Sequence, residues 1–223
     1  MKYLFFGLAF FFGVQYGFSQ TVTVEATTNK KRIAEILKKD KEDAQDNKQY
    51  FAEWDKCRQL TGEGKVKEAE ASCRLVVTYA EKLPKDRYLE RSSAYQSLAC
   101  ALLWQRKADE AIILLNKALE ISKPVLDDTD AETGEIYFSL GLSYHQLGNI
   151  DEARTYYIKA ETTYRTAFKK INDDEIGGHY PKPIIKILEA HLVLLKNSGL
   201  SLEAAKIEKR MEETKVEFAR FLK

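Results

Sequence analysis

The amino-acid sequence predicts an all-α fold, an α-solenoid of about four helical hairpins, and three observations lead to this prediction. The composition suits a helical domain, because the 223 residues combine 44% hydrophobic with 31% charged side chains and include only four prolines. Apolar residues recur at the spacing of one helix face. A set of sequence columns also repeats at a constant interval of 42 residues, which is typical of stacked helical hairpins.

The clearest hairpin is expected between Tyr137 and Ala160, with its turn at Gly148-Asn149. One face of its first helix has the spacing i, i+3, i+4 and i+7, with Tyr137, Leu140, Gly141 and Tyr144. The second helix repeats this pattern with Ala153, Tyr157 and Ala160. Because Gly141 and Ala153 are small, we expect the two helices to approach each other most closely at these residues.

Several independent columns carry the interval of 42 residues. One tripeptide type recurs as Lys67-Glu68-Ala69, Asp109-Glu110-Ala111 and Asp151-Glu152-Ala153, and the same shift superimposes Cys57, Ala99 and Gly141. A fourth repeat is degenerate, since Ala204 lies 51 residues beyond Ala153. The nine extra residues fall in the segment 171–183, where Gly177-Gly178 and two prolines interrupt any helix.

This order of Tyr, Leu-Gly, Tyr, Gly, Ala, Tyr and Ala resembles the tetratricopeptide repeat. The period of 42 residues, longer than the usual 34, resembles the kinesin-light-chain variety of that family. The resemblance implies a right-handed superhelix and a tetratricopeptide-like domain over residues 48–222. Its repeats are expected at about 49–90, 91–132, 133–182 and 183–222.

The N-terminus is expected to direct export. Lys2 precedes an apolar run over residues 4–14, and Gly17 and Ser19 supply small residues after it. Residues 1–19 are therefore interpreted as a signal peptide that is cut after Ser19. An uncleaved membrane anchor is the alternative, although the apolar run is short for a bilayer.

After the signal peptide, residues 20–30 are expected to form a flexible leader, and residues 31–47 either an N-terminal capping helix or a linker. Cleavage removes one of the 35 basic side chains and no acidic one, so that 34 of each remain. A neutral chain without a basic stripe gives no case for nucleic-acid binding. By family resemblance, exported proteins of this kind are mostly bacterial envelope proteins, which predicts a periplasmic or secreted location.

The sequence carries no motif of a catalytic, metal or cofactor site. Its three histidines and three cysteines lack the spacing of metal ligands: His145, His179, His191, Cys57, Cys73 and Cys100. There is no glycine-rich phosphate loop, and no serine lies in a nucleophile elbow. We therefore expect a protein that is not an enzyme and that uses no metal or cofactor.

Two cysteines are expected on the buried sides of the two helices in the first hairpin. Three cysteines in an exported protein allow at most one intramolecular bridge. The spacing places Cys57 and Cys73 about one helical turn out of direct opposition. A disulfide between them and two separate buried thiols therefore both remain open.

In the family, the first helices of the repeats line a concave groove that holds the ligand. Transferred by column, the partner groove comprises Trp54, Arg58, Gln96, Cys100, Trp104, Phe138, Leu142, His145, Gln146, Glu189, Val193, Lys196 and Asn197. Three of these have a structural alternative. Trp54 could pack against the preceding helix, Trp104 could close the core, and His145 could be an ordinary surface or hydrogen-bonded histidine.

Some family members clamp the C-terminal carboxylate of a peptide with lysine, asparagine and arginine side chains. The corresponding columns here hold Trp54, Arg58, Ser97, Glu135 and Ser139. This set departs from the clamp at nearly every position, so we do not expect that mode of binding.

The resemblance implies a non-catalytic scaffold for protein–protein interaction that binds a partner peptide or helix in its concave groove. An apolar groove with polar rims suits such a segment, and Trp and Arg side chains are typical hot spots. Two alternatives keep the same fold. One is a sensory or regulatory module that binds a small ligand or a receptor ectodomain, and the other is a subunit that associates with itself through its end helices.

Overall fold

A computed structural model of the chain describes residues 34–35, 38, 45–170 and 181–219. The chain divides into two units, Met1–Lys48 and Gln49–Lys223. In the first unit, residues 45–48 are helical. The expected signal peptide, the expected leader and most of the segment 31–47 lie outside the described residues, as do residues 171–180 of the helix-breaking segment.

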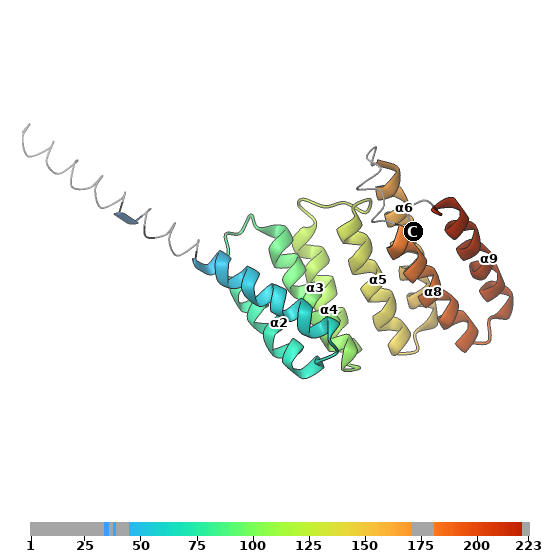
Figure 1. Cartoon of the computed structure of the whole chain (residues 1–223), viewed down its shortest axis with the longest axis horizontal. Helices are drawn as coiled ribbons and strands as arrows, with labels where there is room; N and C mark the ends of the chain where they lie inside the picture. The colour runs from blue at the N-terminus through green and yellow to red at the C-terminus, as the bar shows by residue number, and fades with distance from the viewer. Residues whose placement is uncertain (1–33, 36–37, 39–44, 171–180, 220–223) are drawn as a thin grey trace, which may run out of the picture. The chain divides into compact units, whose positions relative to one another are not determined.

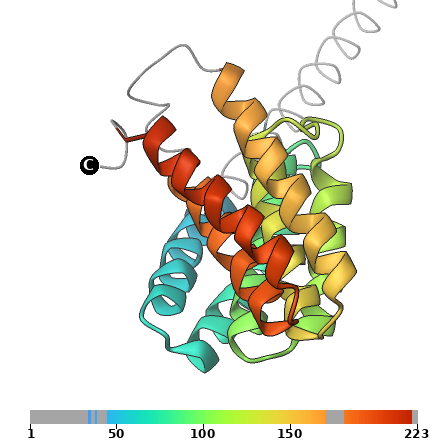
Figure 2. The ribbon, with the colours of Figure 1, turned by 90° about the vertical axis from the view of Figure 1, so that its right-hand side faces the viewer.

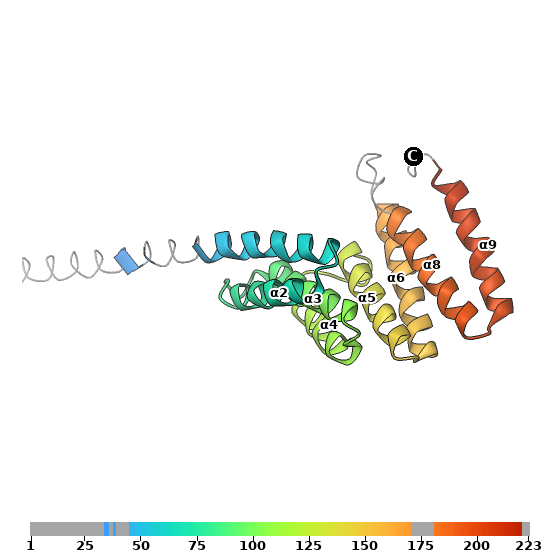
Figure 3. The same cartoon turned by 60° about the horizontal axis from the view of Figure 1, so that its bottom comes forward.

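The second unit consists of helices joined by short turns wherever the structure describes it. Its first helix covers residues 49–62, and it is followed by α2 (Val66–Ala80), α3 (Tyr88–Trp104), α4 (Ala108–Ser122), α5 (Ala131–Gln146), α6 (Ile150–Lys170), α8 (Pro181–Asn197) and α9 (Ser201–Glu217). Consecutive helices pair as hairpins, and the hairpins follow one another in chain order (Figures 1 and 3). The predicted all-α stack of helical hairpins is confirmed.

Each hairpin turns at a residue with a left-handed backbone conformation. The φ angles are 70° at Gly64, 63° at Arg106, 77° at Gly148 and 73° at Gly199. Glycine adopts this conformation at little cost because it lacks a Cβ atom. At the end of α5, the Gly148 amide donates to the His145 carbonyl at 3.1 Å and the Asn149 amide donates to the Tyr144 carbonyl at 3.0 Å. The turn predicted at Gly148-Asn149 is confirmed.

Small residues of the repeat columns lie where paired helices meet. Ala69, Ala111 and Ala153 are all fully buried. A Cβ atom at Gly141 would lie only 2.6 Å from Cδ1 of the buried Tyr157 ring, which is too close for two carbon atoms. The closest approach of α5 and α6 is therefore made by glycine on one helix and an aromatic ring on the other.

The first hairpin is cross-linked at the equivalent pair of positions. Cys57 and Cys73 form a disulfide, and their Cα atoms are 5.0 Å apart. Both cysteines lie two repeat intervals before Gly141 and Tyr157. The expectation that they lie a helical turn out of opposition is wrong, because they occupy the positions at which the paired helices touch.

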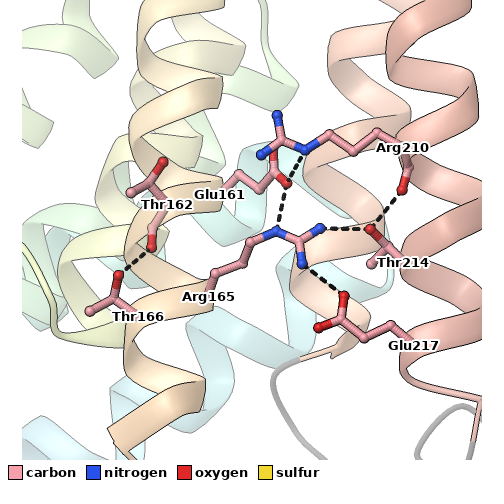
Figure 4. A network of polar contacts seen from close by, with 7 residues as sticks. All are labelled: Glu161, Thr162, Arg165, Thr166, Arg210, Thr214 and Glu217. Atoms are coloured by element: carbon pink, nitrogen blue, oxygen red, sulfur yellow. Dashed lines mark hydrogen bonds and ion pairs between the residues drawn. The ribbon is translucent and has the colours of Figure 1, made fainter.

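Helix α9 packs against α8, with which it forms the last hairpin (Figure 2). Charged side chains also connect α9 with α6 (Figure 4). The buried Glu161 carboxylate accepts a hydrogen bond from Arg165 Nε at 2.8 Å and forms an ion pair with Arg210, whose Nε lies 3.0 Å away. Arg165 also donates to Thr214 Oγ1 at 2.6 Å and to Glu217 at 3.1 Å. Because a buried charge is costly unless it is paired, this network fixes α9 against α6.

The contact between Gly141 and Tyr157 gives a direct test of the packing. Replacing Gly141 with alanine should lower the free energy of unfolding by about 1–3 kcal/mol, because the new methyl group must displace a buried ring. Urea unfolding measures the change. In the matched variant Gly62→Ala, the added Cβ meets nothing within 4 Å, so its stability should equal or exceed that of the parent. Equal stability of the two variants would contradict the packing.

Removal of the disulfide tests the first hairpin. Replacing Cys57 and Cys73 together with alanine should lower the free energy of unfolding by about 3 kcal/mol, because the unfolded chain loses a cross-link across 16 residues. Thermal and urea unfolding measure the loss. The single variant Cys100→Ala, which removes an unbridged cysteine, is the control. A double variant as stable as the parent would show that the bridge adds nothing.

Candidate functional site

Two neighbouring cavities lie on the first helices of the first three hairpins. The Trp54 cavity, of about 400 Å³, is lined by Trp54, Cys57, Arg58, Thr61, Ser93, Gln96, Ser97, Cys100 and Glu135. The Trp104 cavity, of about 590 Å³, is lined by Cys100, Leu103, Trp104, Arg106, Ser139, Leu142, His145 and Gln146. Cys100 belongs to both linings, so the two cavities adjoin along α3 and α5.

The Trp54 cavity brings charged groups and hydrogen-bond donors together. The Arg58 guanidinium lies over the Trp54 ring, with its Cζ atom 4.6 Å from the ring centroid, in a cation–π contact. Trp54 Nε1 is buried, and it has no acceptor in the described part of the chain. Packing of Trp54 against neighbouring helices, the alternative to a place in the groove, therefore leaves its indole N–H without an acceptor among the described residues.

Glu135 of α5 lines the same cavity as Arg58. More than a third of its surface is open to solvent, but the walls of the cavity still desolvate its carboxyl and raise its pKa. The Gln96 amide and the Arg58 charge counteract part of this rise. The Gln96 amide does so as a hydrogen-bond donor to the carboxyl.

The Trp104 cavity presents apolar surface to solvent. Trp104 is 65% exposed, so it does not close the core, and that alternative is excluded. Leu103 is buried beside it and Leu142 is half-buried. Gln146 Nε2 donates a hydrogen bond to the Leu103 carbonyl at 2.9 Å, which fixes the end of α5 against α3.

Cys100, at the junction of the cavities, carries a free thiol. Desolvation, together with the nearby Glu135 charge, raises its pKa to about 11. The Ser139 hydroxyl lies 3.9 Å from its sulfur. Because the thiolate is the nucleophilic form, a thiol with this pKa is inert near neutral pH.

Two histidines contact the buried Tyr157 from different helices. His145 Nδ1 lies 3.1 Å from the Tyr157 hydroxyl, so His145 is a hydrogen-bonded histidine, and desolvation lowers its pKa. His191 of α8 is buried, and its ring centroid lies 5.7 Å from that of Tyr157. Desolvation, reinforced by the charges of Arg154 and Arg210, lowers the pKa of His191 to about 4.

The structure places the predicted groove residues in three different settings. Trp54, Arg58 and Gln96 line the Trp54 cavity, Trp104, Leu142, His145 and Gln146 line the Trp104 cavity, and Cys100 lines both. Phe138 lines neither cavity, and its half-buried ring packs with its centroid 6.0 Å from that of Tyr157. On α8, four exposed side chains also lie outside both linings: Glu189, Val193, Lys196 and Asn197.

The predicted groove set omits several residues that line the cavities, among them Glu135, Ser93 and Leu103. The repeat interval carried a signal for them. Leu103 lies 42 residues before the predicted His145, and Ser93 lies 42 residues before Glu135. Glu135 also occupies one of the columns that a carboxylate clamp would use, so extending each column through all repeats would have found it.

No helix among the described residues is both long enough and apolar enough to cross a membrane. No three histidine, cysteine, aspartate or glutamate side chains in that part of the chain gather closely enough to hold a metal ion.

Acidification should destabilise the fold through His191. Its pKa is about 4 in the folded chain and about 6.5 when unfolded, so its contribution is fully present above pH 6.5 and is lost as the pH falls towards 4. Between pH 7 and pH 4.5 the parent should lose about 2 kcal/mol more of its unfolding free energy than the variant His191→Gln. Urea unfolding at both pH values measures this difference, and equal losses would rule out His191 as the cause.

Comparison with known proteins identifies a family model that matches part of the chain. Residues 92–166 match the family model described as the tetratricopeptide repeat. The structure is similar to that of a TPR-like protein from Chlorobium tepidum TLS, with a TM-score of 0.53 and 17% identity over 68% of this chain and 98% of the other. A putative kinesin light chain from Podosopora anserina, with TPR-like repeats, gives a TM-score of 0.47 and 14% identity over 74% of this chain and 94% of the other.

The search of curated protein sequences gives no match. The likeness to the Chlorobium protein concerns the fold alone, since the two sequences are only 17% identical. The family match covers α3 to most of α6, which includes the Gly141–Tyr157 contact and the Trp104 cavity. Residues 92–166 are therefore tetratricopeptide repeats, in a chain whose described fold is all-α and tetratricopeptide-like.

Proposed function

We propose that this protein is an exported, non-catalytic scaffold that binds a peptide or helix of a partner protein across the Trp54 and Trp104 cavities. Tetratricopeptide repeats generally serve as scaffolds for protein interaction. The observation that carries the proposal is the continuity of the two cavities through Cys100. Together they give one binding face along the first helices of three successive hairpins.

The exposed Trp104 ring is the main anchor of this face. A large apolar side chain that is 65% exposed beside Leu103 and Leu142 gains free energy when a partner covers it. Arg58, stacked on Trp54, supplies a second anchor at the other cavity. Trp and Arg side chains are the residue types most enriched at hot spots of protein interfaces.

A face of this kind is preformed. The helices that carry it are held by the Cys57–Cys73 disulfide and by the Gly141–Tyr157 contact, so a partner need not order them. Association then costs less conformational entropy. Glu189, Lys196 and Asn197 of α8 would form a polar rim beside the exposed Val193, although Lys196 already pairs with Glu208 at 3.1 Å.

We further propose that the protein works in the periplasm or outside the cell. The basis is the sequence of residues 1–19, which has the layout of a signal peptide. The Cys57–Cys73 disulfide supports this location, because disulfides persist in oxidising compartments and are rare in the cytosol.

Self-association through the end helices has less support. The outer side of α9 carries exposed charges, including the pair Lys209 and Glu213 at 3.8 Å. The same helix also exposes Leu202 and Val216, but these two side chains lie 14 residues apart and are single apolar residues among charged ones.

Removal of the Trp104 side chain tests whether partner proteins bind on this face. Trp104→Ala should weaken capture of partner proteins from a cell-envelope extract by about tenfold or more, because a hot-spot side chain is lost. Trp104 is exposed, so the fold should remain intact. The matched control is Ile113→Ala on α4, which removes an exposed apolar side chain that lines neither cavity. Retention of the same proteins by Trp104→Ala and the parent would place binding elsewhere.

A further inference from the structure

The turn between α3 and α4 differs in sequence from the equivalent turns of the neighbouring hairpins. The interval of 42 residues aligns Trp104-Gln105-Arg106 with Gly62-Glu63-Gly64 in the first hairpin and with Gln146-Leu147-Gly148 in the third. The second hairpin alone has tryptophan at the first of these positions, and it has arginine at the third, where the other two have glycine. Both of these side chains line the Trp104 cavity.

Arg106 has a backbone conformation that is unfavourable for an arginine. Its φ angle is 63°, and it is the only non-glycine residue with a positive φ in the part of the chain that the structure describes. In this conformation a Cβ atom crowds the following carbonyl oxygen, a cost that glycine avoids. Residues held in such conformations cluster at sites that bind ligands. The side chain of Arg106 is therefore a candidate for a role in binding.

The Arg106 charge has no counter-ion among the described residues. Arg106 is exposed, and in that part of the chain it forms no ion pair within 4.0 Å. The residues on either side of it bind α2 instead. Gln105 Nε2 donates to the Glu70 carboxylate at 2.6 Å, and Lys107 Nζ pairs with the same carboxylate at 2.9 Å. The turn thus uses two polar side chains for the fold and leaves the guanidinium for a ligand.

The Trp104 cavity is complementary to an acidic group beside an apolar one. Among the residues that line it, only Arg106 is charged near neutral pH, because no acidic residue is present and desolvation lowers the pKa of His145. Leu103, Trp104 and Leu142 supply apolar surface next to this charge. A guanidinium can bind both oxygens of a carboxylate in a planar arrangement.

We propose that Arg106 selects partner segments that carry an aspartate or glutamate next to the apolar side chain that covers Trp104. This inference rests on the proposed scaffold function and states the chemistry of its partner. The carboxylate pairs with Arg106 at the turn after α3, and the apolar side chain lies against Trp104 and Leu142. The acid belongs to a side chain within the segment, because the binding face continues through Cys100 into the Trp54 cavity.

Selection from a random-peptide phage library tests this chemistry. The bait is protein produced from the whole 223-residue sequence. The peptides are displayed at the N-terminus of a coat protein, so none has a free C-terminus. We expect the selected peptides to share an aspartate or glutamate beside an aromatic or aliphatic residue, and to bind Trp104→Ala poorly.

The outcome of the selection separates this inference from the proposed function. Selected peptides that depend on Trp104 but share no acid would overturn the role of Arg106 and leave the scaffold in place. A selection that yields no peptide dependent on Trp104 would contradict both proposals.

A double-mutant cycle then assigns the acid to Arg106. The most enriched peptide, and a variant in which the acid is replaced by the corresponding amide, are titrated by fluorescence anisotropy against the parent and against Arg106→Gln. The amide should bind the parent about fivefold or more weakly than the acid, and should bind Arg106→Gln within about twofold of it. An equal loss with both proteins would refute the assignment.

A control variant removes one positive charge elsewhere. Lys85→Gln lies at an exposed position between α2 and α3, outside the linings of both cavities. It should retain the preference of the parent for the acidic peptide. A loss as large as that of Arg106→Gln would show that the overall charge of the protein, and not Arg106, selects the acid.

Arg106→Gly separates a role in binding from a role in the fold. Glycine relieves the unfavourable backbone conformation, so the melting temperature should rise by about 2 °C. The preference for the acidic peptide should fall to that of Arg106→Gln. A lower melting temperature would show that the arginine serves the fold, and an unchanged preference for the acid would show that it does not select the partner. Either result would overturn the proposal.

Discussion

The close approach of two helices within each hairpin is the constraint on which the rest of this structure depends. One pair of positions makes that approach in three successive hairpins, and the chain fills it in three ways. The first hairpin uses the Cys57–Cys73 bridge, the second has Ala99 and Leu115 at the same columns, and the third sets Gly141 against Tyr157. Each solution keeps total volume small at the contact, because close-packed interiors tolerate neither overlap nor voids.

This packing sets the binding surface, since it fixes which side of each first helix remains open. The residues that directly follow the contact column line the cavities, and their chemistry changes along the stack. The position of Arg58 is occupied by Cys100 in the second repeat and by Leu142 in the third, so it changes from charged to small and then to apolar. A ligand that lies across both cavities would therefore meet polar groups at one end and apolar groups at the other.

Much of the fold could be predicted from the sequence, because the interval of 42 residues fixes which positions are equivalent. The disulfide could not be predicted, because helix periodicity alone does not show at which residues two helices touch. The contact between Gly141 and Tyr157, two repeats later, identifies the equivalent positions. Column transfer found the cavity residues Trp54 and Trp104 but also selected Phe138, which packs on Tyr157. Unpaired donors and desolvated carboxyls depend on several helices at once, so no single stretch of sequence reveals them.

The distribution of aromatic residues makes the protein its own optical reporter. The chain contains two tryptophans, and each cavity is lined by one of them. Trp54 is half-buried under a guanidinium, whereas Trp104 is largely in water, so their emission spectra report two different environments. Events in the two cavities can thus be followed separately by fluorescence, without any attached dye, once either indole is replaced by phenylalanine.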